Sequence, residues 1–193
     1  MVVILDAGHG GIIQGKYQTG GKRSPKRPDG TVLYEGVNNR RIVEEIKKAF
    51  DREFIQYVDV VDSQEDVPLG TRVRRANAIK GNTLYLSIHS NAAGNSGWSD
   101  ARGFGTYIYT GAGSRTRALA EIMHRNLWEN LSEFTRDRGI RERNFYVLKK
   151  TSMSSLLLEL GFHTNLAETY LIESKEWSDA VVNAIVNFVK EAE

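Results

Sequence analysis

Three short apolar segments of the sequence each lead into a residue that can bind a metal ion or transfer a proton. Residues 2–5 lead through Asp6-Ala7-Gly8 to His9, residues 84–88 are followed by His89, and residues 156–158 are followed by Glu159. Short runs of branched apolar residues are typical of buried strands. In open α/β sheets the functional cleft lies beyond the carboxyl ends of such strands. The sequence therefore predicts that these three side chains meet at one edge of a sheet.

Segments with helical periodicity alternate with these strands. In residues 35–50, five apolar positions fall on one helical face: Val37, Ile42, Val43, Ile46 and Phe50. Further helices are expected at 69–79, after Pro68, and at 115–131, 168–172 and 177–189, with strands at 54–61 and 103–109 and an extended segment at 145–148. The alternation indicates an α/β fold with helices on both faces of the sheet. Because the 193 residues contain no repeat or linker, we expect one domain over residues 1–193.

The segments between these elements include one unusually long loop, residues 12–34. It is rich in Gly, Lys and Arg, and its two prolines disfavour regular structure. Loops of this length inside a domain are usually functional or mobile. Its basic residues either steer the protein toward an anionic surface or are simply solvated, and the sequence leaves both readings open: Lys16, Lys22, Arg23, Lys26 and Arg27. Residues 91–102 are expected to form a second loop, and 136–144 a charged connector.

Composition excludes several classes of protein. The net charge of +2 and the isoelectric point of about 8.8 are too mildly basic to indicate nucleic-acid binding. The absence of cysteine excludes a disulfide framework, a thiolate zinc site and a cysteine nucleophile. The sequence has neither an apolar run long enough to span a bilayer nor the pattern of a signal peptide. We therefore expect a protein made in the cytoplasm without insertion into the membrane, unless a signal has been removed.

Two histidines and one carboxylate are the protein ligands of many catalytic zinc sites, where they leave a position open for water. Glu35 begins a helix after the long loop and can lean over the same sheet edge as His9 and His89. A further carboxylate must then move the proton, and Glu159 suits this role because burial raises a carboxyl pKa.

Each of these residues also has a purely structural interpretation. Glu35 is a favourable acid at a helix N-terminus, and Glu159 can pair with an arginine. The run Gly8-His9-Gly10-Gly11 suggests a phosphate loop, but the following Lys-Ser/Thr of such loops is missing. The other two histidines differ: His124 is interpreted as a surface or packing residue, whereas His163 follows Glu159 closely enough to approach the cleft.

Several motifs occur together and in order. They are 5–11 (LDAGHGG), 35–39, 67–69 with Arg72 and 76–77, 87–91 (SIHSN), and 146–148 followed by 158–162 (LELGF) with Asn165. Together they resemble the zinc N-acetylmuramoyl-L-alanine amidases of phage endolysins, spore lysis and cell division, over nearly the whole chain. The resemblance implies that His9, Glu35 and His89 bind one zinc ion and that Glu159 is the catalytic glutamate. It also implies a mixed, mostly parallel sheet of about six strands.

Four polar residues match recurrent positions of this family: Asn39, Arg72, Asn77 and Asn91. Asn91, Asn77 and Arg72 are candidates for contacts with the substrate or with the metal ligands. Of these, Arg72 and Asn77 fit better as structural residues that tie a helix to neighbouring loops, and Asn91 as a contact in the site.

The chain also departs from the family pattern. Residues 153–155 lack the proline that often precedes the catalytic strand, the loop 12–34 is longer and more basic than usual, and neither a regulatory helix nor a wall-binding domain is evident. These features favour a monomeric bacteriolytic enzyme, or the catalytic part of an endolysin, that reaches bacterial peptidoglycan after release. Two alternatives stay open: a zinc peptidase that cuts within the stem peptide, and a non-catalytic peptidoglycan-binding module.

Overall fold

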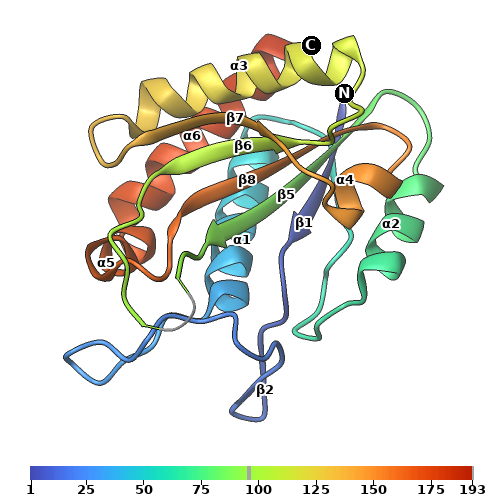
Figure 1. Cartoon of the computed structure of the whole chain (residues 1–193). Helices are drawn as coiled ribbons and strands as arrows, with labels where there is room; N and C mark the ends of the chain where they lie inside the picture. The colour runs from blue at the N-terminus through green and yellow to red at the C-terminus, as the bar shows by residue number, and fades with distance from the viewer. Residues whose placement is uncertain (95–96, 193) are drawn as a thin grey trace.

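A six-stranded mixed sheet forms the centre of the computed structural model, which describes residues 1–94 and 97–192 (Figure 1). Its strands are β1 (Val2–Ala7), β4 (Tyr57–Asp59), β5 (Thr83–Asn91), β6 (Phe104–Ile108), β7 (Asp137–Glu142) and β8 (Ser154–Phe162). They lie in the order β4-β1-β5-β8-β6-β7, and every neighbouring pair is parallel except β6 and β8. The mixed, mostly parallel sheet expected from the sequence is confirmed.

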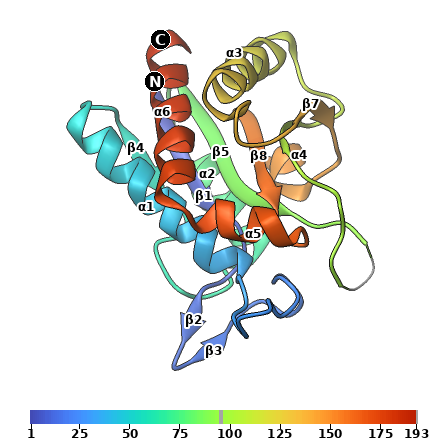
Figure 2. The ribbon, with the colours of Figure 1, turned by 90° about the vertical axis from the view of Figure 1, so that its left-hand side faces the viewer.

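Helices cover both faces of this sheet (Figures 1 and 2). The larger layer consists of α1 (Glu35–Arg52), α3 (Ser114–Leu131) and α6 (Lys175–Ala192), and the smaller one of α2 (Leu69–Ala78) and α4 (Tyr146–Lys150). The short helix α5 (Leu166–Glu173) packs against β8 and α6. None of the helices in the described part of the chain has the length and apolarity needed to cross a bilayer.

Strand alternation decides which face carries the polar residues. In β5, Leu84, Leu86 and Ile88 belong to the larger core beneath α1, α3 and α6, whereas Tyr85 belongs to the smaller core beneath α2 and α4. Because side chains alternate along a strand, His89 points to the same face as Tyr85. His89 and Glu159 are paired residues of the parallel strands β5 and β8, so both side chains lie on the face with the thinner helical cover.

Several sequence-based boundaries were wrong. The expected connector 136–144 contains β7, an edge strand whose half-exposed, charged residues lack an apolar pattern. The segment 145–148, expected to be extended, begins helix α4. The strand expected at 54–61 shrinks to Tyr57–Asp59, because Phe54 has a φ of 56° and is 94% exposed.

Other expectations need smaller corrections. The long loop contains a short hairpin of β2 (Ile12–Ile13) and β3 (Lys16–Tyr17). Val37 is exposed rather than part of the apolar face of α1. Strands β5 and β8 continue past His89 and Glu159, which therefore lie within strands rather than after them. Of the loop expected at 91–102, residues 95 and 96 lie outside the described residues.

A buried ion pair joins the end of β1 to helix α2. Arg72 Nη1 lies 2.6 Å from Asp6 Oδ1, and both side chains are almost inaccessible to solvent. The other Asp6 oxygen accepts hydrogen bonds from Tyr85 and Ser87 of β5, each 2.6 Å long. Burial raises the pKa of Asp6, but Arg72 and the two hydroxyl donors outweigh it, so the pKa lies below its usual value.

We predict that Asp6→Asn lowers the free energy of unfolding by about 3 kcal/mol, because it removes the buried charge that faces Arg72 and leaves the more exposed Asp66, 3.3 Å away, as its acidic partner. Urea denaturation of the metal-free protein at pH 7 measures this loss. The matched control is Asp62→Asn, since Asp62 forms only an exposed ion pair with Arg75 and should change stability little. Equal stability of the two variants would contradict the role given to Asp6.

Candidate metal centre

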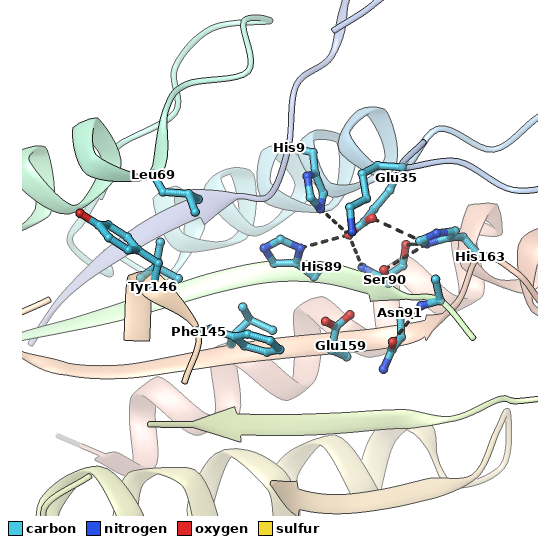
Figure 3. Close-up of a pocket in the computed structure, with 14 residues that line it drawn as sticks. His9, Glu35, Leu69, His89, Ser90, Asn91, Phe145, Tyr146, Glu159 and His163 are labelled. Atoms are coloured by element: carbon cyan, nitrogen blue, oxygen red, sulfur yellow. Dashed lines mark hydrogen bonds and ion pairs between the residues drawn. The ribbon is translucent and has the colours of Figure 1, made fainter. Parts of the chain in front are cut away.

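Three predicted ligands converge at the carboxyl ends of β1 and β5. His9 Nε2 lies 3.2 Å from Glu35 Oε1, and His89 Nδ1 lies 3.0 Å from the same oxygen. The three donor atoms lie within 4.8 Å of one another, a spacing at which they could hold one metal ion. They open into a pocket of about 370 Å³ (Figure 3).

The backbone around His9 is held by two arginines. His9 has a φ of 65°, the left-handed conformation that residues other than glycine rarely adopt. Its carbonyl oxygen accepts hydrogen bonds from Arg40 at 2.9 Å and Arg72 at 3.0 Å, and Arg72 also bonds the Ala7 carbonyl at 2.7 Å. The residue is thus fixed from helices α1 and α2 at once. Sequence reasoning did not identify Arg40, although its place one helical turn after Gly36 was a usable signal.

Glu35 is the first residue of α1, and its exposed fraction is 2%. Besides the two histidines, its Oε1 faces the backbone N–H of Ser90 at 3.3 Å. Burial raises the pKa of Glu35, but the hydrogen bonds and charges of His89 and His9 lower it by more than burial raises it. The pKa therefore lies well below its usual range. Glu35 is therefore ionised, as a metal ligand must be.

Two glycines allow these ligands to approach one another. A Cβ atom on Gly8 would overlap the imidazole of His89, and one on Gly36 would overlap the carbonyl of Gly10. Asn39 of α1 donates a hydrogen bond of 3.2 Å to the Gly8 carbonyl, while Gly8 N–H bonds the Ile88 carbonyl. The loop after β1 is thereby packed between α1 and β5.

Glu159 lines the same pocket but differs from Glu35 in its surroundings. Its Oε2 atom is enclosed and has no hydrogen-bond partner among the described residues. Burial raises the pKa of Glu159 to about 8. A carboxyl with a raised pKa that lines the same pocket as a set of metal donors is suited to exchange a proton with a molecule in the pocket.

Two further predicted residues lie at the pocket. Asn91 lines it and is held by its own contacts to Tyr107 Oη at 3.4 Å and to the N–H of Ala92 at 2.8 Å. His163 is buried, with Nδ1 3.1 Å from the carbonyl oxygen of Ser90 and 3.8 Å from Glu35 Oε2. Burial lowers the pKa of His163, which keeps the ring neutral at pH 7.

The structure places Asn77 and His124 away from the pocket. Asn77 bonds the backbone of Lys150 and Ser152 and so ties α2 to the turn before β8. His124 of α3 bonds Asp137 at 2.8 Å and Thr106 at 3.1 Å. Neither residue is within the lining of the pocket.

The basic loop does not behave as one solvated segment. Arg27 is 6% exposed and forms an ion pair of 2.7 Å with Glu173, so it cannot steer the protein as one of the loop's free cations. Lys22 lines the pocket itself, and its backbone carbonyl accepts the N–H of Glu35 at 3.0 Å. Sequence reasoning grouped both residues with the exposed cations because their partners lie far away in the sequence.

The donor set fits a divalent metal ion. It offers two imidazole nitrogens and one carboxylate oxygen from three different backbone segments, each held by bonds from outside the set. A set of this kind leaves coordination positions open toward the pocket, which Glu159 also lines.

We predict that Glu35→Ala and His89→Ala abolish metal binding, because each removes one of three ligands. Equilibrium dialysis against zinc, followed by metal analysis, should show about one ion per chain in the wild type and close to none in the variants. His124→Ala is the matched control and should keep its metal, since His124 lies outside the pocket. Loss of metal in the control variant, or its retention in the others, would contradict this assignment.

We also predict a pH-dependent effect of Glu159 on the stability of the metal-free protein. The pKa of Glu159 is raised from 4.5 to about 8, so the folded state holds a proton that the unfolded state releases between these pH values. The resulting contribution to the free energy of unfolding is fully present below pH 4.5 and is lost as the pH rises toward 8. Glu159→Gln removes this loss, and at about 1.4 kcal/mol per pKa unit the difference reaches roughly 4 kcal/mol at pH 8. Urea denaturation with a chelator, at pH 4.5 and pH 8, measures it; a pH-independent difference would refute the prediction.

Comparisons with known proteins identify the family of the chain. A family model described as N-acetylmuramoyl-L-alanine amidase (Amidase_3) matches residues 3–191. The uncharacterized protein YqiI of Bacillus subtilis is 33% identical over 186 residues, covering 96% of this chain and 81% of that protein. The endolysin of Bacillus phage SPP1 is 30% identical over 93% of this chain, which spans 61% of the endolysin.

A solved structure is also similar. The N-acetylmuramoyl-L-alanine amidase of Clostridium difficile 630 superposes with a TM-score of 0.81 at 27% identity, covering 98% of this chain and 95% of that one. With a family model that spans nearly the whole sequence and a matching fold, the chain belongs to the N-acetylmuramoyl-L-alanine amidase family.

Proposed function

We propose that this protein hydrolyses the amide bond between the lactyl group of N-acetylmuramic acid and L-alanine of the peptidoglycan stem peptide, with one zinc ion as cofactor. One observation carries the proposal: the donors of His9, Glu35 and His89 share a pocket with Glu159, whose Oε2 has no hydrogen-bond partner among the described residues. Family membership and the endolysin relative support the substrate class and an action on the bacterial wall.

His9, Glu35 and His89 would hold the zinc ion. When bound, zinc supplies Lewis acidity toward an amide carbonyl and lowers the pKa of water. The protein's own contribution is to fix the three donors. Arg40 and Arg72 hold the His9 backbone, and the start of α1 presents Glu35 between the two imidazoles. Fixed donors reduce the reorganisation that the reaction requires.

Glu159 moves the proton. Its carboxylate takes a proton from the attacking water and delivers one to the amide nitrogen as the carbon–nitrogen bond breaks. This role requires a group that can both bind and release a proton near neutral pH. Burial raises the pKa of Glu159 to about 8, whereas the hydrogen-bonded Glu35 stays ionised and cannot exchange a proton in this way.

We predict that purified cell walls lose turbidity with the wild-type protein, that a chelator stops this, and that added zinc restores it. Glu159→Gln should bind zinc normally yet lower the rate by about 10²–10⁴-fold, as expected when a general acid–base is removed. Glu133→Gln, which changes an exposed acid in the turn after α3, serves as the matched control and should remain fully active. Full activity of Glu159→Gln would remove the basis of the mechanism.

Analysis of the product ends then identifies the bond that is cut. Release of a peptide with a new N-terminal alanine, and of an intact sugar, is expected of the amidase. A new terminus inside the stem peptide would instead show a zinc peptidase. Wall binding by a zinc-loaded protein that releases no fragment would show a binding module.

A further inference from the structure

A second cavity, of about 570 Å³, adjoins the pocket that contains the metal donors. We call it the basic groove, and its described lining residues are Gly21, Arg23, Ser24, Pro25, Lys26, Val32, Ala92, Ala93, Gly94, Gly97, His163 and Thr164. Ala92 and His163 line both cavities, so the two lie side by side. A ligand longer than the pocket can extend into the groove past His163.

The basic groove has a one-sided charge. Arg23 and Lys26 are exposed cations, and no aspartate or glutamate belongs to the described lining. Within the described part of the chain, neither cationic side chain forms a hydrogen bond or ion pair, in contrast to Arg27 a few residues along, which is fully engaged. The two charges are therefore available to an anionic ligand.

The backbone that carries Arg23 and Lys26 is held in place. Ser24 N–H donates to the Leu33 carbonyl at 2.8 Å, and Leu33 N–H donates to Ser24 Oγ at 2.9 Å. Next to Lys26 in the sequence, Arg27 donates hydrogen bonds to Thr169 of α5: its Nε lies 2.9 Å from Oγ1 and its Nη2 lies 2.7 Å from the carbonyl oxygen. Fixed attachment points reduce the entropy that the loop loses when it binds a ligand.

The opposite end of the pocket has a different chemistry. Leu69, Phe145 and Tyr146 are all at least partly exposed and lie on one side of the metal donors, whereas His163 lies on the other (Figure 3). Apolar and aromatic surfaces suit the faces of a sugar ring, and cations suit carboxylates. The apolar, aromatic end of the site therefore suits the sugar side of a sugar–peptide amide, and the cationic end suits the peptide side.

We propose that the basic groove binds the peptide side of the substrate through a carboxylate, with Arg23 and Lys26 as the residues that determine this specificity. The inference rests on the proposed function for the identity of the substrate. It gives the substrate one direction across the site: the sugar lies over Leu69 and the two aromatic rings, the scissile amide at the metal donors, and the peptide past His163.

Binding of two muramyl dipeptides that differ by one charge tests the proposal. In one the second amino acid carries a free carboxylate, and in the other this carboxylate is amidated. Isothermal titration calorimetry uses zinc-loaded Glu159→Gln protein, so the ligand is not consumed. We expect about fivefold tighter binding of the free acid, a preference that weakens as salt is added.

The decisive variant adds Arg23→Gln and Lys26→Gln to this background. It should bind both dipeptides equally, at the affinity that the parent shows for the amidated form. The matched control adds Arg52→Gln and Lys80→Gln, two exposed cations that line neither cavity, and should keep the preference. Because it carries the same net charge, it separates local binding from general attraction.

Several outcomes would overturn the proposal: equal binding of both dipeptides by the parent, a preference that survives in the Arg23/Lys26 variant, or its loss in the control. The wild-type protein is assayed separately for cleavage of both dipeptides. A charge preference in binding by a protein that releases no fragment from cell walls would refute the proposed function and leave the basic groove established.

Discussion

The ion pair between Asp6 and Arg72 determines where the rest of the site can lie. A buried carboxylate requires hydrogen-bond donors, and here three donors from two elements meet it: Arg72 of α2, and Tyr85 and Ser87 of β5. Arg72 has donors left over, and it uses them on the carbonyls of Val67, Ala7 and His9. The ion pair thus ties the end of β1 to β5 through Asp6, and to α2 and the backbone of the first metal ligand through Arg72.

Two glutamates of the pocket show how surroundings divide chemical roles between identical side chains. Glu35 faces two imidazoles and a backbone N–H, so its charge is stabilised despite burial. Glu159 is on the neighbouring strand to His89 but has one oxygen without a donor, so burial dominates and favours its neutral form. The first residue is suited to holding a cation, and the second to exchanging a proton.

Much of this arrangement could be predicted because it follows from local patterns. The apolar runs before His9, His89 and Glu159 mark parallel strands, and parallel strands bring their carboxyl ends together. The start of α1 at Glu35 was evident from its helical periodicity. The resemblance to a known family then connected Glu35 with the two histidines, which spacing alone could not have done.

The remaining features depend on contacts that sequence patterns do not record. β7 is an edge strand with one neighbour, so it needs no apolar alternation. Arg27 is buried because α5, which contains Thr169 142 positions later, packs against it through Thr169, Tyr170 and Glu173. In the same way, the engagement of Arg40 with the His9 carbonyl depends on a turn that brings the loop after β1 back over α1.

The close contact between Gly10 and Gly36 has a consequence for how this protein can diversify. The chain leaves the site at Gly10 and returns to it at Glu35, where the two backbones touch. Since the ends of the excursion already meet, adding or removing residues between them costs little closure entropy. Chain closure therefore leaves the length of this segment weakly constrained, and contacts such as those of Lys22 and Arg27 hold it against the rest of the fold.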